Sequence, residues 1–193
     1  NASRDRAPAG TQTAALGMTG YLPGTQGRTT SEEYNGSSWT AITNAGTARY
    51  YGAGFGISTS AIVAGGTAPP TTSTTAAELW NGSSWTAVAS LPGTRSKAQA
   101  GGTTSEGCVF GGVGPPYYPG YPKLATKIDW NGSSWSTSPA SMATAKAFFG
   151  GAASSSPSVY ATGGLTNGSP TYIASTEELG VGTTGVIKTL TTS

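Results

Sequence analysis

The sequence predicts an all-β fold built from four copies of one small unit. The motif Asn-Gly-Ser-Ser-Trp occurs three times, at Asn35–Trp39, Asn81–Trp85 and Asn131–Trp135. Its copies are spaced by 46 and then 50 residues, a period typical of chains that stack one supersecondary unit. Short apolar runs ending in paired glycines recur with the same period. These observations together indicate a repeat protein made of strands.

The apolar runs favour strands over helices. The runs 61–66, 108–112 and 159–164 are too short for helices, show no 3.6-residue periodicity and are bounded by Gly, Pro, Ser and Thr. The first unit contains a degraded version at 15–20. Paired glycines after such a run suit a place where two backbones pass close together.

The Asn-Gly pair of each motif predicts a hairpin turn, because both residues accept a positive φ at little steric cost. The sequence leaves open whether the loop has two residues (Asn-Gly) or four (Asn-Gly-Ser-Ser). A four-residue loop would place Trp80 opposite Trp85 and Trp130 opposite Trp135. Such cross-strand aromatic pairs stabilise a sheet.

Four short strands in a unit of about 40–50 residues form the pattern of a β-propeller blade. We therefore predict a single propeller domain with four blades of four antiparallel strands. The predicted blades cover approximately residues 1–41, 42–87, 88–137 and 138–193. Residues 185–193 would supply the fourth strand of the last blade. We therefore expect the ring of blades to close by packing rather than by a strand borrowed from the N-terminus. An open arc, or a larger ring with further repeats, is left open.

Composition indicates a folded domain with an uncharged polar surface. Charged residues make up 9% of the chain, against about 25% in typical domains. Five Trp, nine Tyr and four Phe argue against disorder, because disordered chains are poor in aromatic residues. The net charge is +2 without a basic cluster, so we expect no nucleic-acid partner. No apolar stretch approaches the length of a membrane helix, so we expect no membrane insertion.

The sequence contains no histidine, which removes the commonest general base and metal ligand. Ser-His-Asp and Cys-His arrangements are therefore impossible. Cys108 is the only cysteine, and its apolar neighbours predict a small buried side chain. We predict no catalytic residue, no metal and no cofactor.

Each unit also has one basic and one acidic position. The basic residues are Arg4, Arg49, Arg95 and Lys146, and the acidic residues are Glu32/Glu33, Glu78, Asp129 and Glu177/Glu178. Because a residue that recurs with the repeat usually stabilises the unit and its neighbour, we interpret them as ion pairs between blades. The alternative is that two of these carboxylates serve sugar hydrolysis.

The recurring tryptophans are interpreted as structural residues of the repeat. They are Trp39, Trp80, Trp85, Trp130 and Trp135. An indole packed between blades buries a large apolar area and can donate its N–H to a neighbouring carbonyl. The alternative for the motif tryptophans is an exposed aromatic surface on which sugar rings stack.

The best candidate for ligand binding is the segment that interrupts the repeat. Residues 113–122 contain Tyr117, Tyr118 and Tyr121 together with four prolines. Proline lowers the entropy lost on ordering, and tyrosine offers amphipathic contact area, as in binding loops. A stiff connector or a subunit contact is the alternative.

Two corresponding loops, at 67–75 and 165–173, are expected on the same face. The second of them adds Tyr172 to the candidate ligand-binding residues. Pro69, Pro70 and Asn167 are weaker candidates.

Three segments together resemble the kelch-like repeat proteins of marine cyanophages: Gly10–Gly17, Glu32–Trp39 and Ile187–Ser193. Those proteins are found among the virion structural and fibre-type proteins of tailed phages. The resemblance covers all four units and implies a virion-associated kelch-like β-propeller that ends at Ser193. The similarity of residues 1–4 to 44–49 leads us to expect a repeat boundary at the N-terminus.

From the residues and this resemblance we expect a non-enzymatic phage virion structural protein or fibre-tip module, at the virion surface or otherwise extracellular. Its expected partners are other virion proteins, a host-surface glycan as a hypothesis, and further copies of itself in a homo-oligomer. A secreted bacterial lectin or adhesin with a kelch-like propeller is the first alternative. A glycosidase-like enzyme is the second.

Overall fold

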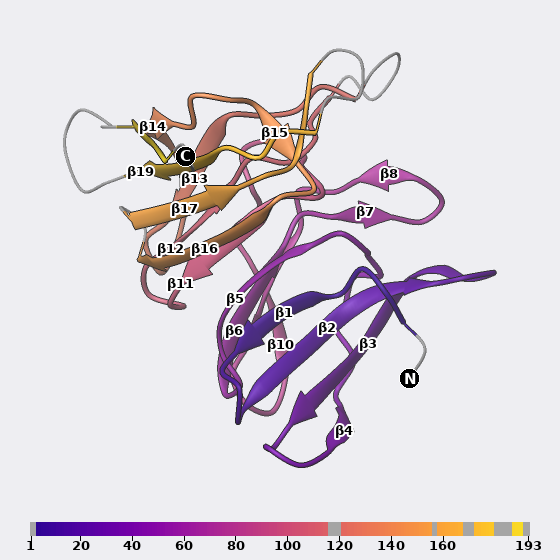
Figure 1. Cartoon of the computed structure of the whole chain (residues 1–193). Coiled ribbons are helices and arrows are strands. Elements are labelled where there is room, and N and C mark those ends of the chain that lie inside the picture. The colour runs from indigo at the N-terminus through magenta and orange to yellow at the C-terminus, as the bar shows by residue number, and fades with distance from the viewer. Residues whose placement is uncertain (1–2, 116–120, 156–157, 168–171, 180–186, 191–193) are drawn as a thin grey trace. The chain divides into compact units, whose positions relative to one another are not determined.

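The structure is a computed structural model that describes residues 3–115, 121–155, 158–167, 172–179 and 187–190. Within these ranges the regular secondary structure consists of strands. The chain divides into two compact units, Asn1–Ser96 and Lys97–Ser193. Each unit contains two four-stranded antiparallel sheets (Figure 1). The predicted fold class, all-β with four propeller blades of four antiparallel strands, is confirmed.

The first unit contains blades 1 and 2. Blade 1 has the strand order β1 (Ala7–Gly10), β2 (Ala15–Leu22), β3 (Gln26–Tyr34) and β4 (Trp39–Ile42). Blade 2 has the order β5 (Ala53–Ile57), β6 (Ser60–Ala64), β9 (Ala77–Trp80) and β10 (Trp85–Val88). A short hairpin, β7 (Thr67–Ala68) and β8 (Thr72–Ser73), lies between β6 and β9 in the chain. Strand β1 packs against β5.

The second unit repeats this plan. Blade 3 consists of β11 (Gln99–Gly102), β12 (Gly107–Phe110), β13 (Thr126–Trp130) and β14 (Trp135–Ser141). Blade 4 consists of β16 (Gly150–Ser155), β17 (Ser158–Thr162), β19 (Thr176–Leu179) and β20 (Ile187–Leu190). The short strands β15 (Lys146–Ala147) and β18 (Leu165–Thr166) pair with each other. Strand β11 packs against β16.

The Asn-Gly-Ser-Ser loop has four residues, since Trp80 pairs with Trp85 across the sheet. The side-chain Oδ1 of Asn81 accepts hydrogen bonds from the backbone N–H groups of Ser83 and Ser84, at 3.0 and 2.9 Å. Gly82 has a φ of +94°, whereas Asn81 does not adopt a positive φ. Only the glycine of the pair needs a positive φ, because the asparagine closes the turn with its side chain. The other two copies form the same turn.

The paired glycines bind the connecting segment that follows each blade. The backbone N–H groups of Gly20, Gly66 and Gly112 donate to the carbonyl oxygens of Arg49, Arg95 and Lys146, at 2.9, 2.8 and 2.9 Å. Gly66 has a φ of +95°, and a Cβ added there would lie 2.8 Å from the carbonyl oxygen of Tyr50. In the first repeat, Thr19 adopts a φ of +56° where the second repeat has Gly65 at +64°. The degraded first copy thus keeps the same backbone path.

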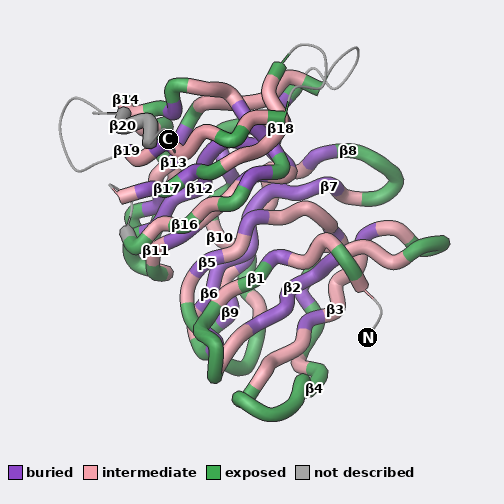
Figure 2. Tube along the Cα trace, viewed as in Figure 1, coloured by how far each residue is buried: buried purple, intermediate pink, exposed green. Residues whose placement is uncertain are grey.

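Each unit has its own apolar core, and buried stretches follow β2 and β6 in the first unit and β12 in the second (Figure 2). The core of the first unit contains Ala7, Leu16, Met18, Ala61, Val63 and Trp80. The core of the second contains Cys108, Phe110, Met142, Phe149, Val159, Ala161 and Leu179. The apolar runs read from the sequence thus form the buried middle strands.

We predict that Gly66→Ala lowers the free energy of unfolding of the chain by about 3 kcal/mol or more, because a Cβ would add a backbone clash to the strain of a positive φ. Chemical denaturation measures this change. Gly24→Ala is the matched control: Gly24 has a φ of +87°, but nothing lies within 4 Å of its added Cβ. This variant should lose only about 1 kcal/mol. Equal losses in the two variants would contradict the close approach at Gly66.

Candidate functional site

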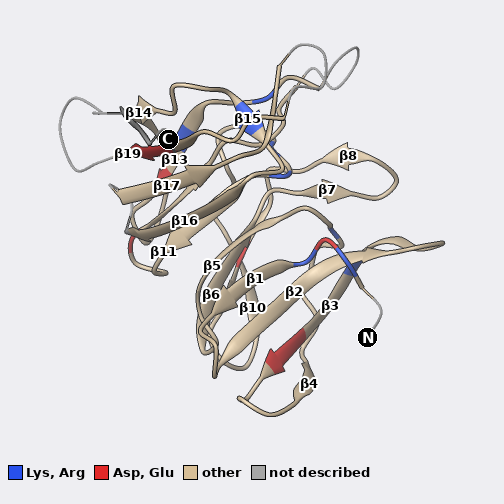
Figure 3. Ribbon diagram, viewed as in Figure 1, with Lys and Arg blue, Asp and Glu red and all other residues tan. Residues whose placement is uncertain are grey.

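The repeated acidic residues are held in ion pairs. The pairs are Arg6–Glu32, Arg49–Glu78, Lys127–Asp129 and Lys146–Glu177. Figure 3 shows how few charged residues the strands carry otherwise. Both partners of every pair belong to one repeat. The hypothesis that these pairs join neighbouring blades is therefore wrong. In three of them a basic residue before a blade reaches into its own blade, and Lys127 lies on β13 itself.

Arg49 is completely buried and its guanidinium has several acceptors. Its Nη1 donates to the carbonyl oxygens of Gly65 at 3.0 Å and Ala76 at 2.5 Å. Its Nη2 lies 2.5 Å from Oε2 of Glu78. Burial lowers the pKa of Arg49, and the Glu78 carboxylate acts in the opposite direction. A buried charge of this kind persists only when it is paired and hydrogen-bonded.

In the first repeat this role belongs to Arg6, not to the predicted Arg4, which is exposed. Arg6 Nε donates to the Thr19 carbonyl and Nη2 to the Thr30 carbonyl, both at 3.2 Å, and Nη1 pairs with Glu32. Thr19 and Thr30 occupy the positions of the carbonyls that bind Arg49. In both repeats one arginine thus binds two carbonyl oxygens and one carboxylate at equivalent positions, although Arg6 lies later in its repeat than Arg49 does.

The paired carboxylates also hold the segments that lead into the blades. Glu78 accepts the backbone N–H groups of Gly46 and Thr47, at 2.6 and 3.2 Å. Glu177 accepts the backbone N–H of Ala143 at 2.9 Å. These contacts make the repeated carboxylates part of the framework. Across the ranges that the structure describes, no group of three or more His, Cys, Asp or Glu side chains could hold a metal ion.

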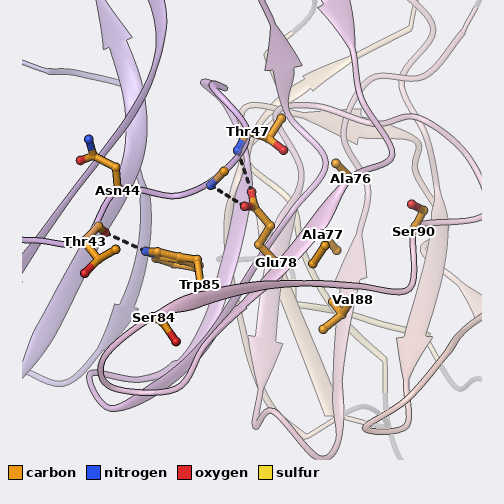
Figure 4. Close-up of a pocket in the computed structure, with 12 residues that line it drawn as sticks. Thr43, Asn44, Thr47, Ala76, Ala77, Glu78, Ser84, Trp85, Val88 and Ser90 are labelled. Atoms are coloured by element: carbon orange, nitrogen blue, oxygen red, sulfur yellow. Dashed lines mark hydrogen bonds between the residues drawn. The ribbon is translucent and has the colours of Figure 1, made fainter.

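A pocket of about 500 Å³ lies in the first unit, between β9 and β10 and the segment 43–47 that precedes blade 2 (Figure 4). Trp85 and Val88 supply apolar surface, and Thr43, Asn44 and Ser90 supply hydroxyl and amide groups. Glu78 also lines the pocket, with its carboxylate turned toward the backbone of Gly46 and Thr47. Sequence reasoning missed this pocket, because its two sides lie far apart in the chain and meet only after folding.

The tryptophans divide into a buried and a more exposed set. Trp80 and Trp130 are buried, and each donates its Nε1–H to a carbonyl of its own blade, that of Ser58 at 2.9 Å and that of Thr104 at 2.8 Å. The motif tryptophans on the outer strands differ from them. Trp39 is 53% exposed, and Trp85 and Trp135 are partly buried.

The predicted tyrosines lie at the surface where the structure describes them. Tyr121 is 53% exposed and Tyr172 is 82% exposed. Tyr117 and Tyr118 lie outside the described residues. Asn167 is not a free polar group, because its amide makes two hydrogen bonds with the backbone of Lys123, at 2.8 and 3.3 Å. This contact ties the loop of blade 4 to that of blade 3. Pro69 and Pro70 are exposed.

Two residues that the sequence did not indicate lie near Tyr121. The Nζ of Lys97 is 4.4 Å from the ring centroid of Phe148 and 5.8 Å from that of Tyr121. Phe148 is 51% exposed. An ammonium group at these distances is attracted to the ring faces. Lys97, Tyr121 and Phe148 form what we call the aromatic–lysine cluster.

Lys97 and Phe148 occupy one recurring backbone position, two residues before the first strand of a blade. The residues at this position are Asp5, Tyr51, Lys97 and Phe148, with φ values of +57, +57, +57 and +52°. Burial raises the pKa of Tyr51, with Asp5 contributing in the same direction. The backbone repeats while the side chain changes each time. Aligning the four repeats and looking for the position just before the first strand at which the residue type varies would have found Lys97 and Phe148.

Comparison with protein-family models found no matching family, and comparison with curated proteins found no similar sequence. The described residues contain no helix of the length and apolar character needed to span a membrane. The site therefore has to be interpreted from its own chemistry.

We predict that Glu78→Gln and Arg49→Met each lower the free energy of unfolding by about 3–5 kcal/mol, because each leaves an uncompensated group of a buried ion pair. Glu106→Gln, at an exposed acidic residue, is the control and should change stability by less than about 0.5 kcal/mol. Denaturant titrations of the three variants give the comparison. Wild-type stability in both pair variants would show that the pair is dispensable.

We predict that the Cys108 thiol reacts with a thiol reagent at pH 8 only as fast as the protein unfolds. Burial raises the pKa of Cys108 to about 12 from its ordinary value of 9.0, so the reactive thiolate is scarce in the native state. Because the unfolded thiol ionises first, stability should also fall as the pH rises from 9 toward 12. Cys108→Ala should lose less over that interval. Rapid labelling of the native protein would contradict the burial.

Proposed function

We propose that this chain is a non-enzymatic recognition module of a phage virion, a structural or fibre-tip part displayed at the virion surface, and that it contacts a host-surface glycan. The observation that carries the proposal is the set of exposed aromatic side chains on segments that differ between repeats. In the second unit these are Tyr121, Phe148 and Tyr172.

The division between framework and variable segments supports binding. Loops that a rigid scaffold positions often carry function. Aromatic side chains on them offer large contact area at low entropic cost. In the aromatic–lysine cluster, the Lys97 ammonium adds a hydrogen-bond donor beside the rings of Phe148 and Tyr121. Rings and polar groups side by side suit the mixed surface of a sugar.

The chemistry of the repeat supports a module without catalytic activity. The chain has no histidine. Glu32, Glu78, Asp129 and Glu177 each face a basic partner. A glycosidase needs two carboxylates placed on either side of the scissile bond, one of them able to give up a proton. Ion-paired framework carboxylates are poor candidates for that task.

The virion assignment rests on the sequence resemblance to kelch-like repeat proteins of marine cyanophages. It implies other virion proteins as partners and further copies of the chain as neighbours. An antibody raised against this chain should label intact phage particles in electron micrographs. Label found only in the secreted fraction of a bacterial culture would favour a lectin or adhesin instead.

We predict that the purified chain binds glycans on an array and that the double variant Tyr121→Ala/Tyr172→Ala binds about tenfold more weakly. A tenfold loss corresponds to about 1.4 kcal/mol of binding free energy. Tyr160→Ala is the matched control, because Tyr160 is 45% exposed but lies on strand β17. Its binding should equal that of the wild type. An array without any bound glycan would refute the glycan contact.

A further inference from the structure

The pocket beside Trp85 is not used by the loop contacts described above. It is a concave site, whereas Tyr121 and Tyr172 project from the surface of the other unit. Concave sites with apolar walls and a few polar groups are where proteins usually bind small molecules. We infer that this pocket binds a neutral sugar, one or two hexose units of a glycan. The inference rests on the proposed function and names a place where the glycan binds.

The indole of Trp85 is fixed as a platform. Its Nε1 donates to the carbonyl oxygen of Thr43 at 2.9 Å. Its ring lies against Trp80, with ring centroids 5.4 Å apart and an angle of 40° between the planes. The ring remains partly exposed. A ring already held in place loses little entropy when a ligand packs on it, and the C–H face of a hexose is a suitable flat apolar partner.

Polar groups with no role in the fold surround this platform. The side chains of Asn44 and Ser90 are exposed and make no hydrogen bond with another described residue. Figure 4 shows Asn44 on the side of segment 43–47 and Ser90 on the opposite side, with Trp85 and Glu78 between them. An amide and a hydroxyl can both donate and accept. They match the hydroxyl groups of a sugar, which also do both.

The charge of the pocket favours a neutral ligand. The Glu78 carboxylate is paired with Arg49, and the buried guanidinium points into the blade. No cation among the residues that line the pocket is left to neutralise an acidic sugar.

The size of the pocket also suits a ligand of one or two hexose units. Its volume of about 500 Å³ lies within the range of about 300–1,000 Å³ of typical small-molecule sites.

Trp39 shows that the motif alone does not make this site. It belongs to the same Asn-Gly-Ser-Ser-Trp motif and lies 5.3 Å from Tyr34, ring to ring. Its indole N–H has no hydrogen-bond partner among the described residues, and the ring is 53% exposed.

The test uses the ¹⁵N-labelled full chain and the signals of its five indole N–H groups. The variants Trp85→Phe and Trp39→Phe assign two of these signals. The probes are methyl α-mannoside, methyl β-glucoside, methyl β-galactoside, maltose, cellobiose, lactose and every neutral glycan that the wild type binds on the array. We expect at least one probe to shift the Trp85 signal and to leave the Trp39 signal in place.

Affinities of the variants complete the test. Trp85→Phe should weaken the binding of that probe about tenfold, since phenylalanine has a smaller ring and lacks the N–H that anchors the indole to Thr43. Asn44→Ala should weaken it about threefold or more without affecting folding, because the exposed side chain makes no hydrogen bond with another described residue. Trp39→Phe, the matched control, should bind as the wild type does. If Trp85→Phe unfolds, the affinity of Asn44→Ala and the shift of the Trp85 indole signal in the wild type still test whether the probe binds in the pocket.

The two proposals fail in different ways. If the array binds glycans that Tyr121→Ala/Tyr172→Ala loses, but no neutral probe shifts the Trp85 signal, the pocket inference is overturned and the proposed function stands. If the array binds only acidic glycans, the pocket inference is likewise overturned and the proposed function stands. If neither the array nor any probe shows binding, both are overturned.

Discussion

The structure depends on a basic residue of each repeat that is ion-paired inside its own blade, and the completely buried Arg49 is the clearest example. Its side chain satisfies Glu78 and two carbonyl oxygens within its own blade. Its own carbonyl oxygen accepts the N–H of Gly20 from the blade before. One residue therefore connects the preceding blade, the connecting segment and the following blade. A buried charge is costly without its partners. The hydrogen bonds and the ion pair of Arg49 therefore form only when the two blades and the segment between them are all in place.

This framework leaves function to the positions that it does not constrain. The repeat keeps its turns, glycine contacts and ion pairs, while the side chain two residues before each first strand changes from Asp5 to Tyr51, Lys97 and Phe148. A positive φ at a residue other than glycine is strained. The backbone keeps this positive φ at every copy, while the residue type differs in each. Residues at such positions can therefore change type without loss of the fold.

The motif tryptophans show how one sequence pattern comes to lie in different environments. The turn is the same in all three copies, because it is closed locally by the asparagine side chain and a glycine with a positive φ. The surroundings of the ring are not local. Trp85 is anchored by Thr43 from the preceding connection and borders a pocket, whereas Trp39 is more exposed than buried. Identical segments can therefore lie in different surroundings.

The sequence by itself determined the strands, the number of blades and the existence of one basic and one acidic position in each unit. These features follow from periodicity and from short segments whose geometry is local, such as the Asn-Gly-Ser-Ser turn. Only the tertiary structure decided that the ion pairs lie within a repeat, that Arg6 replaces Arg4, and that Trp80 is buried while Trp39 is not. Burial and pairing depend on segments that meet only after folding. For the same reason the pocket of Trp85 had no signature in the sequence, and the only sign of the aromatic–lysine cluster was a repeat position at which the residue type varies.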